Sequence, residues 1–314
     1  MIRAARRPDF LVIGGSRCGT TSLHAALVRH PSLFVPAEKS PNFFSAPDVD
    51  AVPDSDALRA MKGHAVTSEP EYEALFAAAP ADRLVGEVSP VYLQSIHTAA
   101  RAASYCPDAR IIVMLRQPVK RAFAHWLGRR RDGLDPHEHF EQAIAGDLAS
   151  PASPDIAFNR YLAIGRYGHF LAPWFAAFPR IRIHVAFFDD FVRDPRGTVN
   201  AVCAFLGVPP LSGEIPMEHR NAGGIIRQPL LRAAWTRTAL LRAQLRRHLP
   251  AGLRDAAGRV FLRSLDRPEL AAASADRLLA YYRDDLVALE ALLQRPLPPW
   301  DGSAPRESRL DQRP

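Results

Sequence analysis

The amino-acid sequence predicts an α/β fold, with a central parallel sheet and helices on both of its faces. Short apolar runs rich in β-branched or aromatic residues predict four buried strands, at Phe10–Ile13, Leu84–Gly86, Ile111–Leu115 and Ile183–Phe188. Helical periodicity predicts helices at Thr20–Arg29, Val119–Arg131, Tyr161–Phe178, Arg196–Leu206 and Ser274–Leu293. Because strands that alternate with helices form parallel sheets, the expected architecture is a three-layer sandwich.

The remaining segments are expected to complete a single large domain. Segments 45–80 and 132–156 are rich in Pro, Asp and Ala, and we expect them to be surface excursions over the sheet. Residues 225–265 have an Arg-rich helical pattern and are expected to form a C-terminal helical arm. The predicted domain spans residues 8–301, and residues 302–314 form a polar tail.

The composition is typical of a soluble globular protein. Of the 314 residues 47% are hydrophobic and 23% are charged, and the mean hydropathy is −0.12. No stretch approaches the roughly 18 apolar residues that a membrane-spanning helix needs. The three cysteines, Cys18, Cys106 and Cys203, are odd in number and widely spaced, which favours a reducing compartment over a disulfide framework. We therefore expect a cytoplasmic protein.

The formal net charge is +7, and of the 40 basic residues all but Lys39, Lys62 and Lys120 are arginine. The arginine excess indicates either an acidic partner or a genome-wide preference for arginine, and both interpretations stay open. Without a long basic tract, nucleic acid is not an expected partner. In the arm the arginines recur at every fifth position, which spreads them round a helix at about 100° per residue. The arm is therefore either solvated or in peripheral contact with an anionic surface; these arginines are Arg227, Arg232, Arg237, Arg242 and Arg247.

The strongest local signal is a glycine-rich loop between the first strand and the first helix. Gly14, Gly15 and Gly19 let the backbone turn with its N–H groups pointing inward, and the helix that begins near Thr20 adds a partial positive charge. The spacing resembles that of the phosphate-binding P-loop, but Thr20 stands at the lysine position. The hydroxyl donors are Thr20, Thr21 and Ser22, and the cation is Arg17. The sequence thus predicts a P-loop-like anion site; a glycine-rich turn without a ligand is the alternative.

The residue that follows the predicted strand Ile111–Leu115 differs from the residue found there in a nucleotide hydrolase or kinase. Those proteins carry an Asp after a second strand to hold Mg²⁺. Here the strand Ile111–Leu115 is followed by Arg116, which would meet a second anion without a metal. His64, His137 and other histidines lack the spacing of metal ligands, so no metal is expected. A P-loop kinase is therefore a weak alternative.

These residues resemble the PAPS-dependent sulfotransferases, which transfer sulfuryl groups from 3′-phosphoadenosine 5′-phosphosulfate (PAPS) and release adenosine 3′,5′-bisphosphate. The segment Gly15–Thr21 resembles their 5′-phosphosulfate loop, and Leu115–Trp126 resembles their 3′-phosphate motif, an Arg-x-Pro followed by Arg-Ala-aromatic-Ser. Arg116 matches the phosphate-binding arginine, whereas Ala124 stands where the family keeps a serine. The donor-binding residues implied by the resemblance are Gly15, Ser16, Arg17, Cys18, Gly19, Thr20, Thr21, Ser22, Arg116 and Ala124.

The resemblance extends over nearly the whole chain. Gly86–Leu93 is similar to the family's Gly-Glu-x-[Ser/Thr]-Pro-x-Tyr segment, and Ala275–Trp300 to its terminal helix and tryptophan. The similarity is greater to the heparan-type and bacterial carbohydrate sulfotransferases than to the aryl enzymes. It implies transfer to a hydroxyl of a carbohydrate or glycolipid. Because a basic loop near the family's end is not found here, Arg220 or Arg227 is expected to take its place.

The general base is the least clear part of the predicted site. Where carbohydrate sulfotransferases carry Lys-Glu, this chain has Lys39-Ser40. Lys39 is still expected to reach the sulfuryl group, together with Arg17. The carboxylates that could replace the base are Glu87, at the end of a buried strand, and Glu38; His125 is a third candidate. A nucleotide-binding protein without catalysis also fits Ser40 and Ala124.

Overall fold

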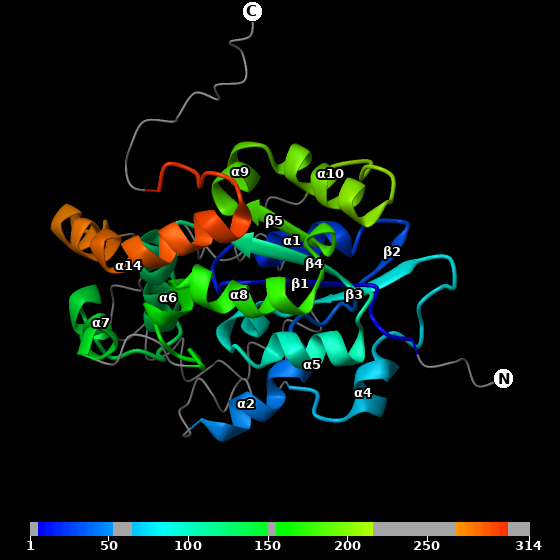
Figure 1. The fold of residues 1–314 in the computed structure, drawn as a ribbon, viewed down its shortest axis with the longest axis horizontal. Helices are drawn as coiled ribbons and strands as arrows, with labels where there is room; N and C mark the ends of the chain where they lie inside the picture. The colour runs from blue at the N-terminus through cyan, green and yellow to red at the C-terminus, as the bar shows by residue number, and fades with distance from the viewer. Residues whose placement is uncertain (1–5, 53–64, 150–154, 216–267, 301–314) are drawn as a thin grey trace, which may run out of the picture.

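The computed structural model describes residues 6–52, 65–149, 155–215 and 268–300. Its centre is a parallel sheet of five strands in the order β2-β3-β1-β4-β5, visible edge-on in Figure 1. The strands are β1 (Phe10–Gly14), β2 (Leu33–Phe34), β3 (Leu84–Val88), β4 (Arg110–Leu115) and β5 (Ile183–Phe187). The predicted parallel sheet is confirmed, and β1 lies in its middle.

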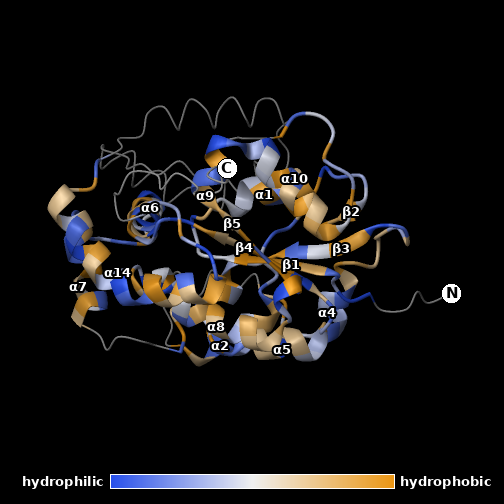
Figure 2. Ribbon diagram, turned by 45° about the horizontal axis from the view of Figure 1, so that its top comes forward, coloured by the Kyte–Doolittle hydropathy of each residue, from blue (hydrophilic) through white to orange (hydrophobic). Residues whose placement is uncertain are grey.

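The strands are buried on both faces, and their side chains alternate between two cores. In β1, Leu11 and Ile13 pack on one face, whereas Phe10 and Val12 pack on the other. The helices α5 (Thr98–Tyr105), α8 (Tyr167–Ala177) and α14 (Ala272–Leu293) cover the first face, and α1 (Thr20–Leu27) and α10 (Pro195–Leu206) cover the second. Figure 2 shows these two helical layers with the apolar sheet between them, which confirms the three-layer sandwich.

Shorter elements connect these layers. The remaining α-helices are α2 (Ala46–Ala51), α4 (Glu69–Ala74), α6 (Pro118–Arg131), α7 (Phe140–Ala149) and α9 (Phe188–Arg193). The 3₁₀ turns are η1 (Phe43–Ser45), η2 (Pro90–Gln94), η3 (Ala163–Gly165) and η4 (Arg180–Arg182). Of these connecting helices, only α6 was predicted from the sequence.

Two predictions differ from the structure. The helix expected over Tyr161–Phe178 begins only at Tyr167, because the chain first forms the 3₁₀ turn η3. The segments expected as surface excursions contribute buried aromatics: Tyr72 and Phe76 lie in the larger core, and Phe140 packs against α6. These two segments therefore contribute side chains to the hydrophobic cores as well as to the surface.

The C-terminal helix α14 packs along α8, and its buried residues include Tyr282 and Asp285. The Asp285 carboxylate accepts the backbone N–H groups of Gly168 (2.9 Å) and His169 (3.0 Å), which ties α14 to the start of α8. The expected arm at 225–265 and the tail at 302–314 lie outside the described residues. Within the described ranges, the structure contains no helix with the length and apolar character of a membrane span.

Candidate active site

The glycine-rich loop connects β1 to α1 at the carboxyl edge of the sheet. Two loop residues have left-handed backbone conformations, Arg17 with φ 72° and Gly19 with φ 88°. Gly19 is also required sterically, because a Cβ atom there would lie 2.8 Å from the ring of Phe188. The Cys18 N–H donates to the Gly15 carbonyl (3.2 Å), which closes the loop into a tight turn.

The loop is followed directly by α1, whose N-terminus has no side-chain cap. No side chain caps the N-terminus of α1, and its first turn contains no acidic residue, so the positive end of the helix is not neutralised. Lys39 reaches this point from the segment after β2. Its Nζ donates to the Oγ1 atoms of Thr20 (2.9 Å) and Thr21 (3.3 Å). The predicted proximity of Lys39 to the loop is thus present.

Two cations flank the loop, and burial perturbs both. Burial, together with the positive charge of Arg17, lowers the pKa of Lys39 to about 8. Burial likewise lowers the pKa of Arg17 to about 10, with Arg131 and Arg116 acting in the same direction. Arg17 is therefore charged at neutral pH, and Lys39 is mostly charged. A site with this excess of buried positive charge favours an anion.

Arg116 lies at the end of β4, next to the loop, as predicted. Its Nη1 donates to the carbonyl of Arg17 (3.1 Å), and its guanidinium stacks 4.4 Å above the ring of Phe188. Tyr167 donates to the carbonyl of Arg116 (2.8 Å). Burial lowers the pKa of Arg116, and its Nε has no hydrogen-bond partner among the described residues. The guanidinium therefore keeps one buried donor without a partner within the described ranges.

The other predicted donor-binding residues occupy the loop or the adjoining helices. The hydroxyl of Ser16 accepts from Nε2 of Gln94 in η2 (3.0 Å). The Cys18 side chain points away from solvent, toward the hydroxyl of Tyr167 (3.6 Å). It therefore packs on the interior side of the loop. Ser22 lies in the first turn of α1, and Ala124 is half-buried in α6. The loop contact of Gln94 was not predicted.

Glu87, the first candidate for the base, is enclosed. Its carboxylate is 1% exposed and accepts hydrogen bonds from the hydroxyls of Tyr72 (3.2 Å) and Ser89 (2.7 Å). Burial raises the pKa of Glu87 to about 7, and these hydrogen bonds and Tyr92 oppose that shift. No ion pair of Glu87 occurs among the described residues. The group can exchange a proton near neutral pH.

The other candidates lie in different surroundings. Glu38 is exposed beside Lys39. Burial lowers the pKa of His125 well below its usual value, as do the charges of Arg121 and Arg17, so its imidazole is neutral. Arg220 and Arg227 lie outside the described residues.

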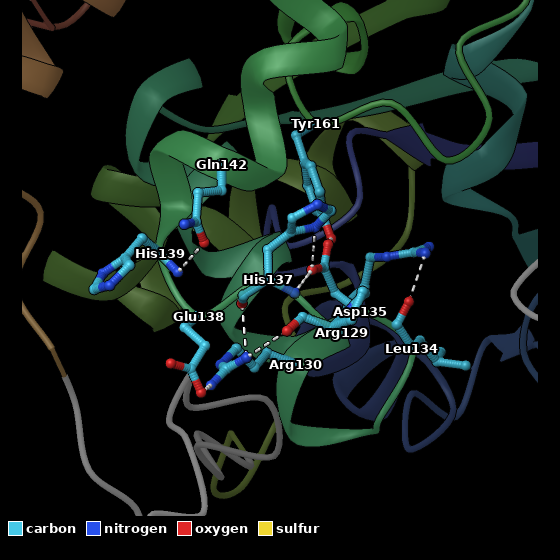
Figure 3. A network of polar contacts seen from close by, with 10 residues as sticks. Arg129, Arg130, Leu134, Asp135, His137, Glu138, His139, Gln142 and Tyr161 are labelled. Atoms are coloured by element: carbon cyan, nitrogen blue, oxygen red, sulfur yellow. Dashed lines mark hydrogen bonds and ion pairs between the residues drawn. The ribbon is translucent and has the colours of Figure 1, made fainter.

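A polar network follows the C-terminal end of α6, close to the loop (Figure 3). Both oxygens of the buried Asp135 carboxylate are used: one accepts from Tyr161 and the other contacts Nδ1 of His137 (2.9 Å). Arg130 donates to the carbonyl of His137 (2.7 Å), and the guanidinium of Arg129 lies 5.7 Å from the centre of the Tyr161 ring. This network holds the segment after α6 in place beside Arg17, whose charge interacts with Tyr161.

The segment after α14 contacts the N-terminal ends of α6 and α9 through Trp300. The indole N–H of Trp300 donates to Asp189 (3.0 Å), and its carbonyl accepts from Gln117 (3.3 Å), the residue that caps α6. The Asp189 charge in turn acts on Arg116. The terminal tryptophan noted in the sequence therefore holds Asp189, whose charge acts on the arginine of the predicted second anion site.

Two further observations concern other sites. Among the residues that the structure describes, no cluster of His, Cys, Asp or Glu could hold a metal ion. A surface pocket of about 770 Å³ opens at the amino-terminal edge of the sheet, lined partly by Arg7, Arg110 and Arg182, and none of its lining residues belongs to the glycine-rich loop. The candidate active site is therefore identified by its donors and charges and not by that pocket.

Comparison with known proteins agrees with this geometry. The profile of the sulfotransferase family matches residues 8–212. Human bifunctional heparan sulfate N-deacetylase/N-sulfotransferase 3 is 28% identical over 305 residues, which are 94% of this chain and 31% of that protein. The mouse bifunctional enzyme 4 is 28% identical over 303 residues, 93% of this chain and 31% of that protein. The chain thus spans about a third of the length of these curated relatives.

A solved structure resembles the whole fold. The sulfotransferase from Alicyclobacillus acidocaldarius is 27% identical, with a TM-score of 0.70, and the match covers 94% of this chain and 99% of that one. The family profile alone covers well over half of the sequence. This chain therefore belongs to the sulfotransferase family of enzymes.

Proposed function

We propose that this protein transfers a sulfuryl group from PAPS to a hydroxyl of a carbohydrate or glycolipid. The observation that carries the proposal is the pair of cations, Arg17 and Lys39, beside an uncapped helix N-terminus, with Arg116 on the neighbouring strand. These groups suit a ligand with two separated anionic ends. The residue after β4 is an arginine and not the aspartate of a Mg²⁺-dependent kinase, which argues against the kinase alternative.

The donor set fits such a nucleotide. We assign the 5′-phosphosulfate to the loop Gly15–Gly19 and to the N–H groups and hydroxyls at the start of α1. The 3′-phosphate is assigned to Arg116, whose Nε has no partner among the described residues, and to the face of α6 that carries Ala124. Arg220 remains part of the proposal and lies outside the described residues.

When bound, the donor supplies an activated sulfuryl group. The acceptor oxygen forms a bond to sulfur, the bond from sulfur to the phosphate oxygen breaks, and the acceptor proton goes to a base. Arg17 and Lys39 stabilise the charge that develops on the leaving phosphate oxygen. Their rigid placement also holds the reacting groups in line.

Glu87 is the base we test first. Its pKa near 7 suits proton exchange at neutral pH, and it lies at the carboxyl end of β3, beside β1. Replacing it by Gln should lower the transfer rate by about 10²-fold or more if it accepts the proton. Glu38→Gln is the parallel variant; wild-type rates in both would reject both assignments.

The acceptor class rests on the relatives. The human and mouse relatives named above carry heparan sulfate in their names, which supports a carbohydrate acceptor. Those names also specify N-sulfation, so an acceptor panel should contain amino sugars as well as hydroxyl acceptors and glycolipids. The protein's three buried cysteines are free, which agrees with the proposed cytoplasmic location.

The test has two stages. Isothermal titration calorimetry with adenosine 3′,5′-bisphosphate should give binding without added metal, and radiolabelled PAPS should then transfer label to a member of the panel. Absence of nucleotide binding would reject the proposal. Binding without transfer to any acceptor would instead favour a nucleotide-binding protein that lacks catalysis.

A further inference from the structure

Arg121 is a fully buried arginine directly beneath the glycine-rich loop. It lies in α6 and is 0% exposed. Its Cδ would lie 3.0 Å from a Cβ atom built on Gly15, so its stem passes against the loop backbone. Its Nη2 donates to the carbonyl of Tyr161, whereas Nε and Nη1 have no hydrogen-bond partner among the described residues.

No carboxylate pairs with this guanidinium within the described part of the chain. The neighbouring arginines of α6 differ in this respect, since Arg130 pairs with Glu138 (3.7 Å) and Arg131 with Asp132 (2.9 Å). The groups whose charges interact with Arg121 are Cys18, Tyr167, Tyr282, His125 and Arg116. Among the residues that the structure describes, Arg121 is therefore a buried cation surrounded by neutral or positive groups.

The neighbouring acidic groups do not supply a counter-ion. Burial raises the pKa of the Cys18 thiol and of the Tyr167 and Tyr282 hydroxyls, so all three are neutral at physiological pH. A buried charge without a partner destabilises a folded protein. The arrangement is explained if the compensating charge arrives with a ligand, because the loop above Arg121 is the site assigned to the donor's anionic end.

We propose that Arg121 is an electrostatic positioning residue whose counter-ion is the bound anionic donor. The inference rests on the proposed function. Arg121 does not touch the ligand: it acts through the loop, where its stem supports Gly15 and its charge adds to those of Arg17 and Lys39. The free protein is then less stable than it would be with a neutral side chain at this position, and donor binding removes the penalty.

The experiment compares Arg121→Met with Arg130→Met, which removes a buried but paired arginine from the same helix. For each variant we would measure the Tm of the free protein and the affinities for adenosine 3′,5′-bisphosphate and adenosine 3′-monophosphate by calorimetry. We expect Arg121→Met to keep or raise the Tm and to weaken bisphosphate binding by about tenfold or more. Because the 3′-monophosphate lacks the 5′-phosphate assigned to the loop above Arg121, its affinity should fall less.

Arg130→Met should lower the Tm and leave both affinities within about threefold of wild type, since its charge is neutralised locally. An Arg121→Met protein with a lower Tm and equal losses for both ligands would overturn the proposal, as would unchanged affinities. If Arg121→Met fails to fold, Arg121→Lys and Arg121→Gln decide: the charged variant should retain affinity within about threefold and the neutral one should not. Wild-type protein that binds neither nucleotide would instead reject the proposed function itself.

Discussion

The guanidinium of Arg17 lies against Gly128 in α6, in space that any other residue at that position would fill. A Cβ atom built on Gly128 would lie 1.9 Å from Nη2 and 2.4 Å from Cζ of Arg17. The left-handed backbone of Arg17 directs its side chain toward α6 (φ 72°). The position of the loop cation is thus set by a glycine more than a hundred residues away in sequence.

Gly128→Ala should displace the Arg17 side chain and lower the rate of sulfuryl transfer by about tenfold or more. The displaced guanidinium would no longer stabilise the negative charge on the leaving phosphate oxygen. Steady-state rates with radiolabelled PAPS measure this. Gly146→Ala is the matched control, since Gly146 lies in α7 and a Cβ atom there would meet nothing within 4 Å. It should leave the rate unchanged and stabilise the protein by about 0.5–1 kcal/mol, the ordinary gain of alanine in a helix. Equal rates in the two variants would contradict the role given to Gly128.

Donor affinity should fall as the pH rises through the pKa of Lys39. That pKa is about 8 in the free protein, so the ammonium form that attracts an anion is lost above it. One pH unit above the pKa, the affinity for adenosine 3′,5′-bisphosphate should be lower by up to about tenfold. Binding near pH 8 should also take up protons, because the bound anion raises the lysine pKa; calorimetry in buffers of different ionisation enthalpy detects this uptake.

Lys39→Arg provides the control for this pH dependence. A guanidinium keeps its charge well above pH 8, so the variant should bind with nearly constant affinity up to about one pH unit beyond the wild-type decline. A decline at the same pH in wild type and Lys39→Arg would assign the titration to another group.

Burial of Glu87 should make the protein less stable as the pH rises. Its pKa in the folded state is about 7, above the ordinary 4.5, so the folded protein binds this proton more tightly than the unfolded chain does. The free energy of unfolding should therefore decrease between about pH 4.5 and pH 7, by on the order of 3 kcal/mol from this group. Urea unfolding at a series of pH values measures the slope.

Glu87→Gln should reduce that slope and be at least as stable as wild type at pH 8, because the amide stays neutral while it still accepts a hydrogen bond from Tyr72 or Ser89. Glu38→Gln, at an exposed position, should leave the slope unchanged. A wild-type slope in Glu87→Gln would show that the buried carboxylate does not titrate in this range.

Ala124→Ser should strengthen donor binding, because it restores the hydroxyl that the family's 3′-phosphate motif carries. One added hydrogen bond to a charged group is worth about 1.5–3 kcal/mol, or tenfold and more in affinity. Ala103→Ser in α5, likewise half-buried, is the control and should not change the affinity. Calorimetry with adenosine 3′,5′-bisphosphate compares the two variants. An unchanged affinity in Ala124→Ser would contradict the assignment of the 3′-phosphate to this face of α6.

Local sequence patterns were sufficient for the central sheet and the loop. The apolar runs of β1, β3, β4 and β5 and the glycines before α1 give strong signals within a few residues. The edge strand β2, only Leu33–Phe34, is too short for periodicity to detect. The Ala-rich helix α5 has few large apolar residues and also escaped prediction.

The residues of the candidate site were predictable where a local motif identifies each of them, and less so where tertiary packing decides. Arg17, Lys39 and Arg116 were expected, and the contacts of Lys39 and Arg116 agree with that expectation. The enclosure of Glu87 depends on Tyr72, which comes from a segment expected at the surface. The burial of Arg121 likewise depends on the packing of η3 and α14 against α6, which no local pattern records.

The strand order β2-β3-β1-β4-β5 has a consequence for the lifetime of the site. The glycine-rich loop follows β1, Arg116 follows β4 and Glu87 lies on β3. The parts of the site are therefore attached to three adjacent central strands. Exchange of the β1 amide protons requires separation from β3 or β4, which also dismantles the site. We therefore expect no partially unfolded form to retain nucleotide binding, and the bound nucleotide should slow hydrogen exchange across all three strands together.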